Sequence, residues 1–208
     1  MRKFIKRVKK HLRIIGADEI ARRYFVMNGF DGALTTLGII MGAYLAGVIE
    51  ARVILSAGLG ASIAMGISGA FGAYITEKAE RTRYIKELEK ALFTSLTNSI
   101  INRASQTATI FVAFIDALSP ICTTLISLSP FILSLLNILP ANLTIIFATI
   151  LNITTLFILG VFLGRVSKSN VWLYGSLMVL SGFIIILIFI FIGTFMRVYL
   201  IFLFHLTP

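Results

Sequence analysis

Residues on which soluble enzymes depend are scarce in this sequence. Only 13% of its 208 residues are charged, whereas about 25% are charged in a typical soluble domain. The two histidines, His11 and His205, lie too far apart in the chain to suggest a metal pair, and no HExxH, CxxC, Walker or GxSxG pattern occurs. The single cysteine, Cys122, cannot form an intrachain disulfide, and its apolar sequence neighbours predict a buried structural thiol. These absences leave no catalytic constellation, so the sequence predicts a protein that is not an enzyme and needs no cofactor.

Long apolar runs, by contrast, are abundant. Hydrophobic residues make up 58% of the chain, and its mean hydropathy is +0.95. Several runs exceed the roughly 18 residues that a helix needs to cross a bilayer, whereas a membrane barrel would show short alternating segments. The sequence therefore predicts an all-α, polytopic membrane protein with five transmembrane helices. The predicted spans are 25–48, 53–76, 107–136, 143–163 and 171–195.

The spans divide the chain into four parts. A basic leader, 1–24, precedes the two spans of 25–76, and a short cytoplasmic helical segment, 77–104, separates them from the three spans and apolar tail of 105–208. In the leader, apolar residues recur among cations at near-helical spacing, which is typical of an amphipathic helix on a membrane surface. We expect this helix to bind anionic lipid through its cations, chiefly Lys3, Lys6, Arg7, Lys9 and Lys10.

The distribution of positive charge predicts the orientation of the helices. The chain has 19 lysines and arginines against 9 acidic residues, a net charge of +10. All of these cations except Arg52 and Arg197 fall in the leader, in 77–104 or in the turn before the fifth span, which share one side of the membrane in this topology. Because cytoplasmic loops collect lysine and arginine, the N-terminus should be cytoplasmic. We expect the protein to lie in the plasma membrane of a prokaryote. The same rule accounts for the positive charge, so that lipid rather than nucleic acid is the expected partner.

Asp31 is the first candidate functional residue. It is the only charged residue in the predicted span 25–48, and a carboxylate at the centre of a bilayer costs about 2.5–3.5 kcal/mol. Ionisable groups that are kept inside a membrane despite this cost commonly serve a cation or a proton. The alternative is a helix N-cap near the membrane surface, where a carboxylate costs less.

Asp116 and Met65 complete the candidate path for a metal or a proton. Asp116 lies four residues before Pro120, and a proline in a helix frees a backbone carbonyl that can bind a cation. Pro120 and Pro130 are expected to break the third span. The alternative for Asp116 is a hydrogen bond to a neighbouring serine or threonine beside a kink. The thioether of Met65 is a soft ligand suited to ferrous iron and late transition metals, although methionines in spans are commonly packing residues.

Three glutamates share one face of the helix predicted after the second span: Glu77, Glu80 and Glu87. Their carboxylate oxygens could gather a divalent ion on the cytoplasmic side. The alternative, which the surplus of nearby cations favours, is i, i+3 and i, i+4 ion pairing on a solvated helix. The cations available for such pairs are Lys78, Arg81, Arg83 and Lys90.

Glycine is concentrated in the first two spans. Small residues at helical spacing let helix backbones approach closely in lipid. We expect these glycines to form helix-packing faces, chiefly at Gly38, Gly42, Gly66, Gly69 and Gly72. The fourth and fifth spans, rich in isoleucine, leucine and phenylalanine, are predicted to face mainly lipid, with Gly160 and Gly164 as one further small-residue pair.

Two motifs in these glycine-rich spans resemble the vacuolar iron transporter family. They are NGFDGALT at 28–35 and AMGISGAFGAY at 64–74; the segment ILGVFLGR at 158–165 and the number of spans also fit. In this resemblance Asp31 matches the family's first-span aspartate. The family pattern near the end of the second span reads roughly Ser-Met-x-x-Gly-Glu-Tyr, and here Gly69 and Ala73 replace the methionine and the glutamate. Met65, one turn earlier, is our suggested substitute for the missing thioether.

The resemblance implies a homodimer with a path at the subunit interface. Such a protein would export Fe²⁺ or Mn²⁺ from the cytoplasm in exchange for protons, with the divalent metal as the transported ion. The segment 77–104 is short and basic, and it lacks the long glutamate-bearing insert of family members that have a cytoplasmic metal-binding domain. Two alternatives stay open: a non-transporting membrane scaffold or interaction protein, and a transporter of another cationic solute.

Overall fold

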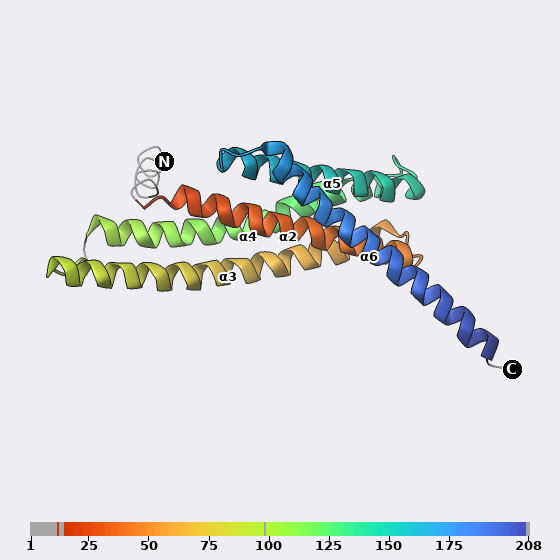
Figure 1. Cartoon of the computed structure of the whole chain (residues 1–208), viewed down its shortest axis with the longest axis horizontal. Helices are drawn as coiled ribbons and strands as arrows, with labels where there is room; N and C mark the ends of the chain where they lie inside the picture. The colour runs from red at the N-terminus through yellow and green to blue at the C-terminus, as the bar shows by residue number, and fades with distance from the viewer. Residues whose placement is uncertain (1–11, 13–14, 98, 207–208) are drawn as a thin grey trace. The chain divides into compact units, whose positions relative to one another are not determined.

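The structure, a computed structural model, describes residues 12, 15–97 and 99–206. Five helices occur in this part of the chain, and each is long and apolar enough to cross a membrane (Figure 1). This confirms the predicted all-α fold with five transmembrane helices. The leader cations expected to bind lipid, Lys3, Lys6, Arg7, Lys9 and Lys10, lie outside the described residues. The helices are α2 (Ala17–Leu45), α3 (Ala51–Leu92), α4 (Ile100–Leu135), α5 (Ala141–Val166) and α6 (Val171–Leu206).

Glycines mark both ends of α2. Gly16, with φ +63°, precedes the first turn. In that turn the carboxylates of Asp18 and Glu19 interact favourably with the positive end of the helix dipole. After the last turn, Gly47 adopts φ +72°, and the amide of Val48 donates to the Ala43 carbonyl over 2.9 Å. This is the left-handed glycine cap that commonly ends a helix. The helix therefore begins before the predicted span and ends at a local backbone signal.

α3 joins two predicted elements into one helix. It continues from the second predicted span through Glu77 to Leu92, and the chain turns back before α4 begins at Ile100, as the sequence predicts for a helical extension followed by a return. The return begins at Phe93, which adopts φ +50°. α4 then starts behind an N-cap, in which the Ser99 Oγ accepts a hydrogen bond of 3.1 Å from the amide of Asn102.

α4 passes through both of its prolines without interruption. The helix is continuous from Ile100 to Leu135, so the prediction that Pro120 and Pro130 break this span is wrong. A proline removes one hydrogen bond from a helix, but serine and threonine side chains nearby can satisfy the carbonyl that it frees. A membrane-spanning helix can therefore contain a proline when a nearby side chain donates a hydrogen bond to the freed carbonyl.

The helices divide between two compact units. Unit 1 contains the residues up to Asn28 together with Ile63–Ile121, and unit 2 contains Gly29–Ser62 together with the residues from Cys122 onward. Each of the helices α2, α3 and α4 is divided, with one part in unit 1 and the other in unit 2. α5 and α6 belong wholly to unit 2. Each unit has its own core.

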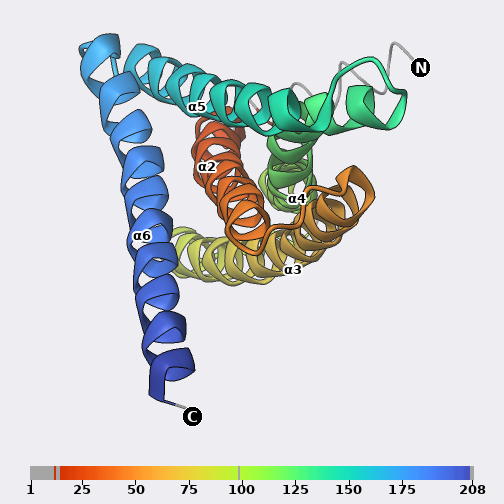
Figure 2. The ribbon, with the colours of Figure 1, turned by 90° about the vertical axis from the view of Figure 1, so that its right-hand side faces the viewer.

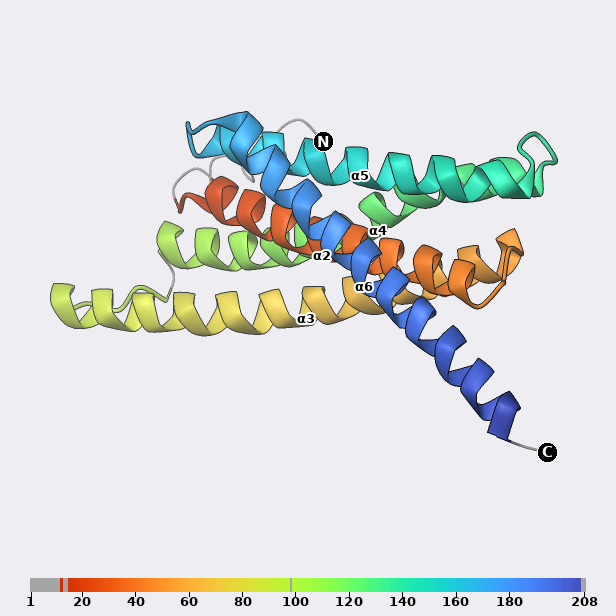
Figure 3. The same cartoon turned by 45° about the vertical axis from the view of Figure 1, so that its right-hand side comes forward.

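Small side chains form the core of unit 1. Within this unit α3 and α4 lie side by side (Figure 3). A Cβ on Gly66 would lie 2.7 Å from the carbonyl oxygen of Ala117, which is closer than any side chain tolerates. The two backbones therefore touch at this position, as small residues allow. One buried apolar cluster of the unit is formed by Ala21, Ala73, Val112 and Ala113, and a second by Leu12, Ala17 and Ala108.

The core of unit 2 contains larger apolar side chains, and two helices of this unit are in direct backbone contact. α5 and α6 leave their shared turn at 167–170 and then diverge (Figure 2). Near that turn, a Cβ on Gly160 would lie 2.4 Å from the Tyr174 carbonyl oxygen, and a Cβ on Gly164 would lie 2.7 Å from the Val171 Cα. The backbones thus meet without intervening side chains. The main buried residues of the core are Ile40, Ile54, Leu128, Phe131 and Ala148.

Two expectations about exposure need correction. Cys122 is exposed, so the prediction of a buried structural thiol is wrong. Its position within an apolar run does not determine which face of α4 it occupies. α6 is the least buried of the five apolar helices, as expected for a lipid-facing span, but α5 is more buried than predicted, since Thr144, Asn152 and Thr155 are all buried.

Candidate functional site

A carboxylate is buried within unit 1. Asp116, on α4, is only 2% exposed. Its Oδ1 accepts a short hydrogen bond from the Nδ2 of Asn28, on α2. One turn along α4, the Ser119 hydroxyl donates to the backbone carbonyl of Phe25. Two side chains of α4 thus bind α2 at neighbouring positions, and both bonds lie within apolar surroundings where polar groups need partners.

Gly69 provides the room that this carboxylate occupies. A Cβ on Gly69 would lie 2.8 Å from the Asp116 Oδ2 and 3.4 Å from the Asn28 Nδ2. The carboxylate therefore packs directly against the α3 backbone. The family pattern that the sequence resembles places a methionine at this position, and here the Asp116 carboxylate occupies the space that a side chain would need.

Unit 2 contains a second set of buried polar groups, and none of them is ionisable. The Thr36 hydroxyl donates to the Gly32 carbonyl over 2.7 Å and lies 2.9 Å from the Thr124 hydroxyl. The Nδ2 of Asn152 donates to the Ala33 carbonyl over 2.9 Å and to the Ser127 hydroxyl over 3.0 Å. These bonds join α2, α4 and α5 inside the unit.

The amide of Asn152 is the member of this second set whose hydrogen bonding is incomplete. The residue is 0% exposed, and its Oδ1 has no hydrogen-bond partner among the described residues. Both of its donated bonds cross to other helices. A buried polar acceptor that lacks a partner is costly, so the two donated bonds must outweigh that cost.

We expect Asn152→Ala to lower the free energy of unfolding by about 2 kcal/mol. The variant loses two interhelical hydrogen bonds and leaves the Ala33 carbonyl and the Ser127 hydroxyl with fewer partners. Thermal unfolding of the purified protein in detergent measures the effect. The matched control is Asn142→Ala on the exposed surface of the same helix, which should change stability by less than about 0.5 kcal/mol. Equal stability of the two variants would contradict the assigned role of Asn152.

The structure distributes the predicted metal and proton residues between the two units. Asp116 and Met65 belong to unit 1, where Asp116 is buried and Met65 is half-buried. Asp31 belongs to unit 2 and is exposed on α2. Of the three residues, Asp116 is therefore the one that the single chain encloses.

Two of the three glutamates predicted to gather a divalent ion form local ion pairs. The Glu77 Oε2 lies 3.1 Å from the Arg81 Nη2, and the Glu87 Oε1 accepts a bond of 2.9 Å from the Arg83 Nε. Glu80 is exposed. Across the described residues there is no group of three or more histidine, cysteine, aspartate and glutamate side chains that could hold a metal ion. The favoured alternative of i, i+4 pairing describes Glu77 and Glu87 as the structure places them.

The glycines expected to pack helices occupy different environments. Gly66 and Gly69 lie against α4, as described above, and Gly38 and Gly42 lie in ordinary contact with the Phe189 ring of α6, at 3.8 Å and 3.4 Å from a built Cβ. A Cβ on Gly72 would meet no atom within 4 Å. Gly72 therefore opens onto the surface of the described chain.

Sequence reasoning assigned no role to Asn28, Asn152 or Thr36. Each carries a signal that could have been used, since an amide or hydroxyl inside an apolar run must find a partner. Asn28 belongs to the NGFDGALT motif, but only the tertiary structure pairs it with Asp116, 88 positions away.

Five apolar helices with carboxyl, amide and hydroxyl groups buried within the units define a multi-pass membrane protein with a polar interior. Residues 22–94 match the VIT family, over a stretch that contains Asp31, Met65 and Gly69. A protein of Methanocaldococcus jannaschii, described as uncharacterized, is 36% identical over 164 residues, which cover 77% of this chain and 82% of the relative. The chain belongs to the VIT family. Members of this family are transporters and not enzymes. No solved structure matches the chain.

Proposed function

We propose that this VIT-family protein transports a divalent transition-metal cation, Fe²⁺ or Mn²⁺, and exports it from the cytoplasm in exchange for protons. The observation that supports this most strongly is the Asp116 carboxylate, 2% exposed in a helix that is apolar enough to cross a membrane. Ionisable groups at such positions typically mark ion pathways and proton relays. The proposal places the N-terminus in the cytoplasm and the protein in the plasma membrane.

The coupling follows from the energetics of a carboxylate in a dry environment. A negative charge in a medium of low dielectric constant is costly even when it accepts hydrogen bonds, so we expect the group to hold either a proton or a cation. Arrival of a divalent metal releases the proton, and arrival of a proton releases the metal. Asn28 holds the carboxylate in place through its amide, and the absence of a side chain at Gly69 leaves room for the carboxylate beside α3. Met65 is half-buried on α3, about one helical turn before Gly69, and its thioether is the proposed soft ligand.

Asp31 has a separate role in this proposal. It is exposed on the single chain, and a carboxylate that faces lipid is unfavourable inside a bilayer. A second copy of the chain would cover it, so that two copies of Asp31 line the path of a homodimer. The open environment of Gly72 also supports a surface against which another helix can pack.

Movement of the path between its two states is proposed to use weak points in two helices. These are Gly29 in α2 and Pro120 in α4. Glycine and proline both weaken the helix backbone at the positions where bending is needed. Transporters commonly alternate by the motion of one bundle against another around a fixed site.

Metal uptake into proteoliposomes tests the proposal. Asp31→Asn is expected to lower the initial rate of Mn²⁺ flux at least about tenfold, since the amide binds neither a proton nor a divalent cation as a carboxylate does. The matched control is Asp18→Asn, an exposed carboxylate in the first turn of the same helix, which should leave the flux unchanged. Unaltered flux in Asp31→Asn would remove this residue from the mechanism.

A thermal-shift measurement separates transport of a metal from the alternatives. Mn²⁺ or Co²⁺ should raise the unfolding temperature of the purified protein, and the effect should be smaller in Asp31→Asn. A scaffold protein would show no metal-dependent shift. A carrier of an organic cation would be stabilised by that solute and not by the metal.

A further inference from the structure

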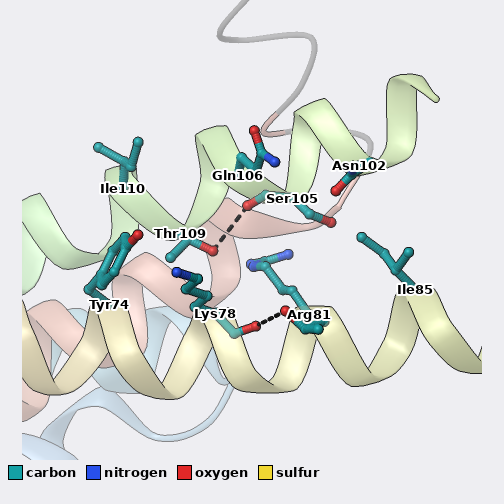
Figure 4. A pocket seen from close by; sticks show the side chains of 10 residues that line it. Tyr74, Lys78, Arg81, Ile85, Asn102, Ser105, Gln106, Thr109 and Ile110 are labelled. Atoms are coloured by element: carbon teal, nitrogen blue, oxygen red, sulfur yellow. Dashed lines mark hydrogen bonds between the residues drawn. The ribbon is translucent and has the colours of Figure 1, made fainter. Parts of the chain in front are cut away.

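A basic pocket lies between α3 and α4 within unit 1, beyond the buried Asp116. Its volume is about 280 Å³, and its walls are formed by residues 74–85 of α3 and 102–110 of α4. Figure 4 shows Lys78 and Arg81 extending from α3 toward α4, with the Lys78 ammonium beside Tyr74 and Thr109 and the Arg81 guanidinium below Ser105. None of the residues that line it is acidic. The pocket therefore presents two cations to whatever enters it.

Arg81 is the unusual member of this pocket. The residue is only 8% exposed, and its Nε and Nη2 are buried with no hydrogen-bond partner among the described residues. The Glu77 Oε2 lies 3.1 Å from the Nη2 and balances the charge, but the geometry gives no hydrogen bond. A buried guanidinium is stable only when its charge and its N–H donors are satisfied. Glu77 supplies the charge, and the donors still need acceptors.

Lys78 adds a second positive charge at the mouth of the pocket. It is exposed, and its Nζ lies 5.5 Å from the centre of the Tyr74 ring, so the aromatic face holds the ammonium near the opening. Ser105 and Gln106 provide hydroxyl and amide donors from the second turn of α4. With Glu77 counted against Arg81, Lys78 leaves the site with a net positive charge.

We propose that this pocket binds a phosphate group. Guanidinium and ammonium groups with hydroxyl and amide donors are the combination that proteins use for phosphate, because its several oxygens accept bonds from all of them. A phosphate in the pocket would offer acceptors to the Arg81 guanidinium, for whose Nε and Nη2 the described part of the chain provides none. The group can belong to an anionic phospholipid, whose headgroup lies at the ends of membrane helices, or to a soluble phosphate compound. The site is separate from the proposed metal path and does not depend on it.

The test compares two sources of phosphate on the full-length protein. Native mass spectrometry counts phosphatidylglycerol bound to the purified protein, with phosphatidylcholine as the reference lipid, and thermal shift measures binding of inorganic phosphate against chloride at equal ionic strength. Lys78→Gln and Arg81→Gln should each weaken binding of the active probe about tenfold. Arg83→Gln is the matched control, because it removes one exposed cation from the same helix but does not line this pocket.

The outcomes separate a built site from general attraction of anions. Selective binding of phosphatidylglycerol identifies a lipid headgroup site, and binding of inorganic phosphate identifies a site for soluble phosphates; either supports the proposal if the variants weaken it. Equal weakening by Arg83→Gln, or no binding of either probe, overturns it. Arg81→Gln leaves Glu77 unpaired, so the double variant Glu77→Gln/Arg81→Gln is measured in parallel. Lys78, which is exposed, can be replaced without disturbing the core.

Discussion

Alanine in place of Gly160 is expected to destabilise the protein by about 3 kcal/mol, at the upper end of the range for overpacked sites. The added Cβ would lie 2.4 Å from the Tyr174 carbonyl oxygen and 2.7 Å from the Gly175 Cα. These are backbone atoms of α6, so no side-chain rotation can relieve the contact. α5 and α6 must separate near their shared turn, and the contacts that depend on their close approach weaken. Thermal unfolding of the purified protein in detergent measures the loss.

Gly60→Ala is the matched control for this prediction. Gly60 also lies within a helix, on α3, but a Cβ there would meet no atom within 4 Å. Since alanine is the better helix former, this variant should be more stable by about 0.5–1 kcal/mol. The two substitutions make the same chemical change and are expected to have opposite signs. A destabilisation of similar size in both would show that the α5–α6 contact is not the cause.

Valine in place of Gly69 is expected to reduce the proposed metal flux to nearly that of protein-free vesicles. Its Cβ would lie 2.8 Å from the Asp116 Oδ2 and 3.4 Å from the Asn28 Nδ2, and its methyl groups need still more room. The carboxylate must move away from α3, and its bond to Asn28 is strained or lost. Misplacement of a binding group by about 1 Å can cost roughly a hundredfold in rate.

Flux and folding are measured on the same samples. Gly60→Val introduces the same side chain into α3 at an open position and should transport normally. A Gly69→Val protein that is folded, monodisperse and fully active would show that Asp116 is not part of the path. A protein that is folded but inactive supports the assignment of Asp116 even if metal still binds elsewhere.

The spans were predictable because their signal is local. Hydropathy over a window of residues is a property of the sequence alone, and the requirement that every backbone group be bonded within a helix permits few alternatives in lipid. The continuation of α3 past the second apolar run to Leu92 was also predictable from the helical spacing of its charges. The effect of Pro120 and Pro130 was not, because a freed carbonyl can be satisfied by groups that only the tertiary structure brings near.

The candidate site was predictable only in part. Asp116 stands out in sequence because it is a lone charge in an apolar run. Its partner Asn28 lies on another helix, and the reason why Gly69 is small appears only when α3 and α4 are placed together. The face of a helix that a residue occupies decided the remaining cases, including the exposure of Asp31 and the ion pairs of Glu77 and Glu87.

The exposure of Cys122 has a practical consequence. It is the chain's single cysteine, and it follows Pro120 in α4 by two positions. A thiol-reactive spin label can therefore be attached to the unaltered sequence at one known position. If two copies associate, each carries one label, and the pair yields a dipolar coupling in pulsed EPR that reports their separation. A chain that remains monomeric in detergent or lipid yields no such coupling. Labelling of the native thiol therefore measures the distance between subunits directly.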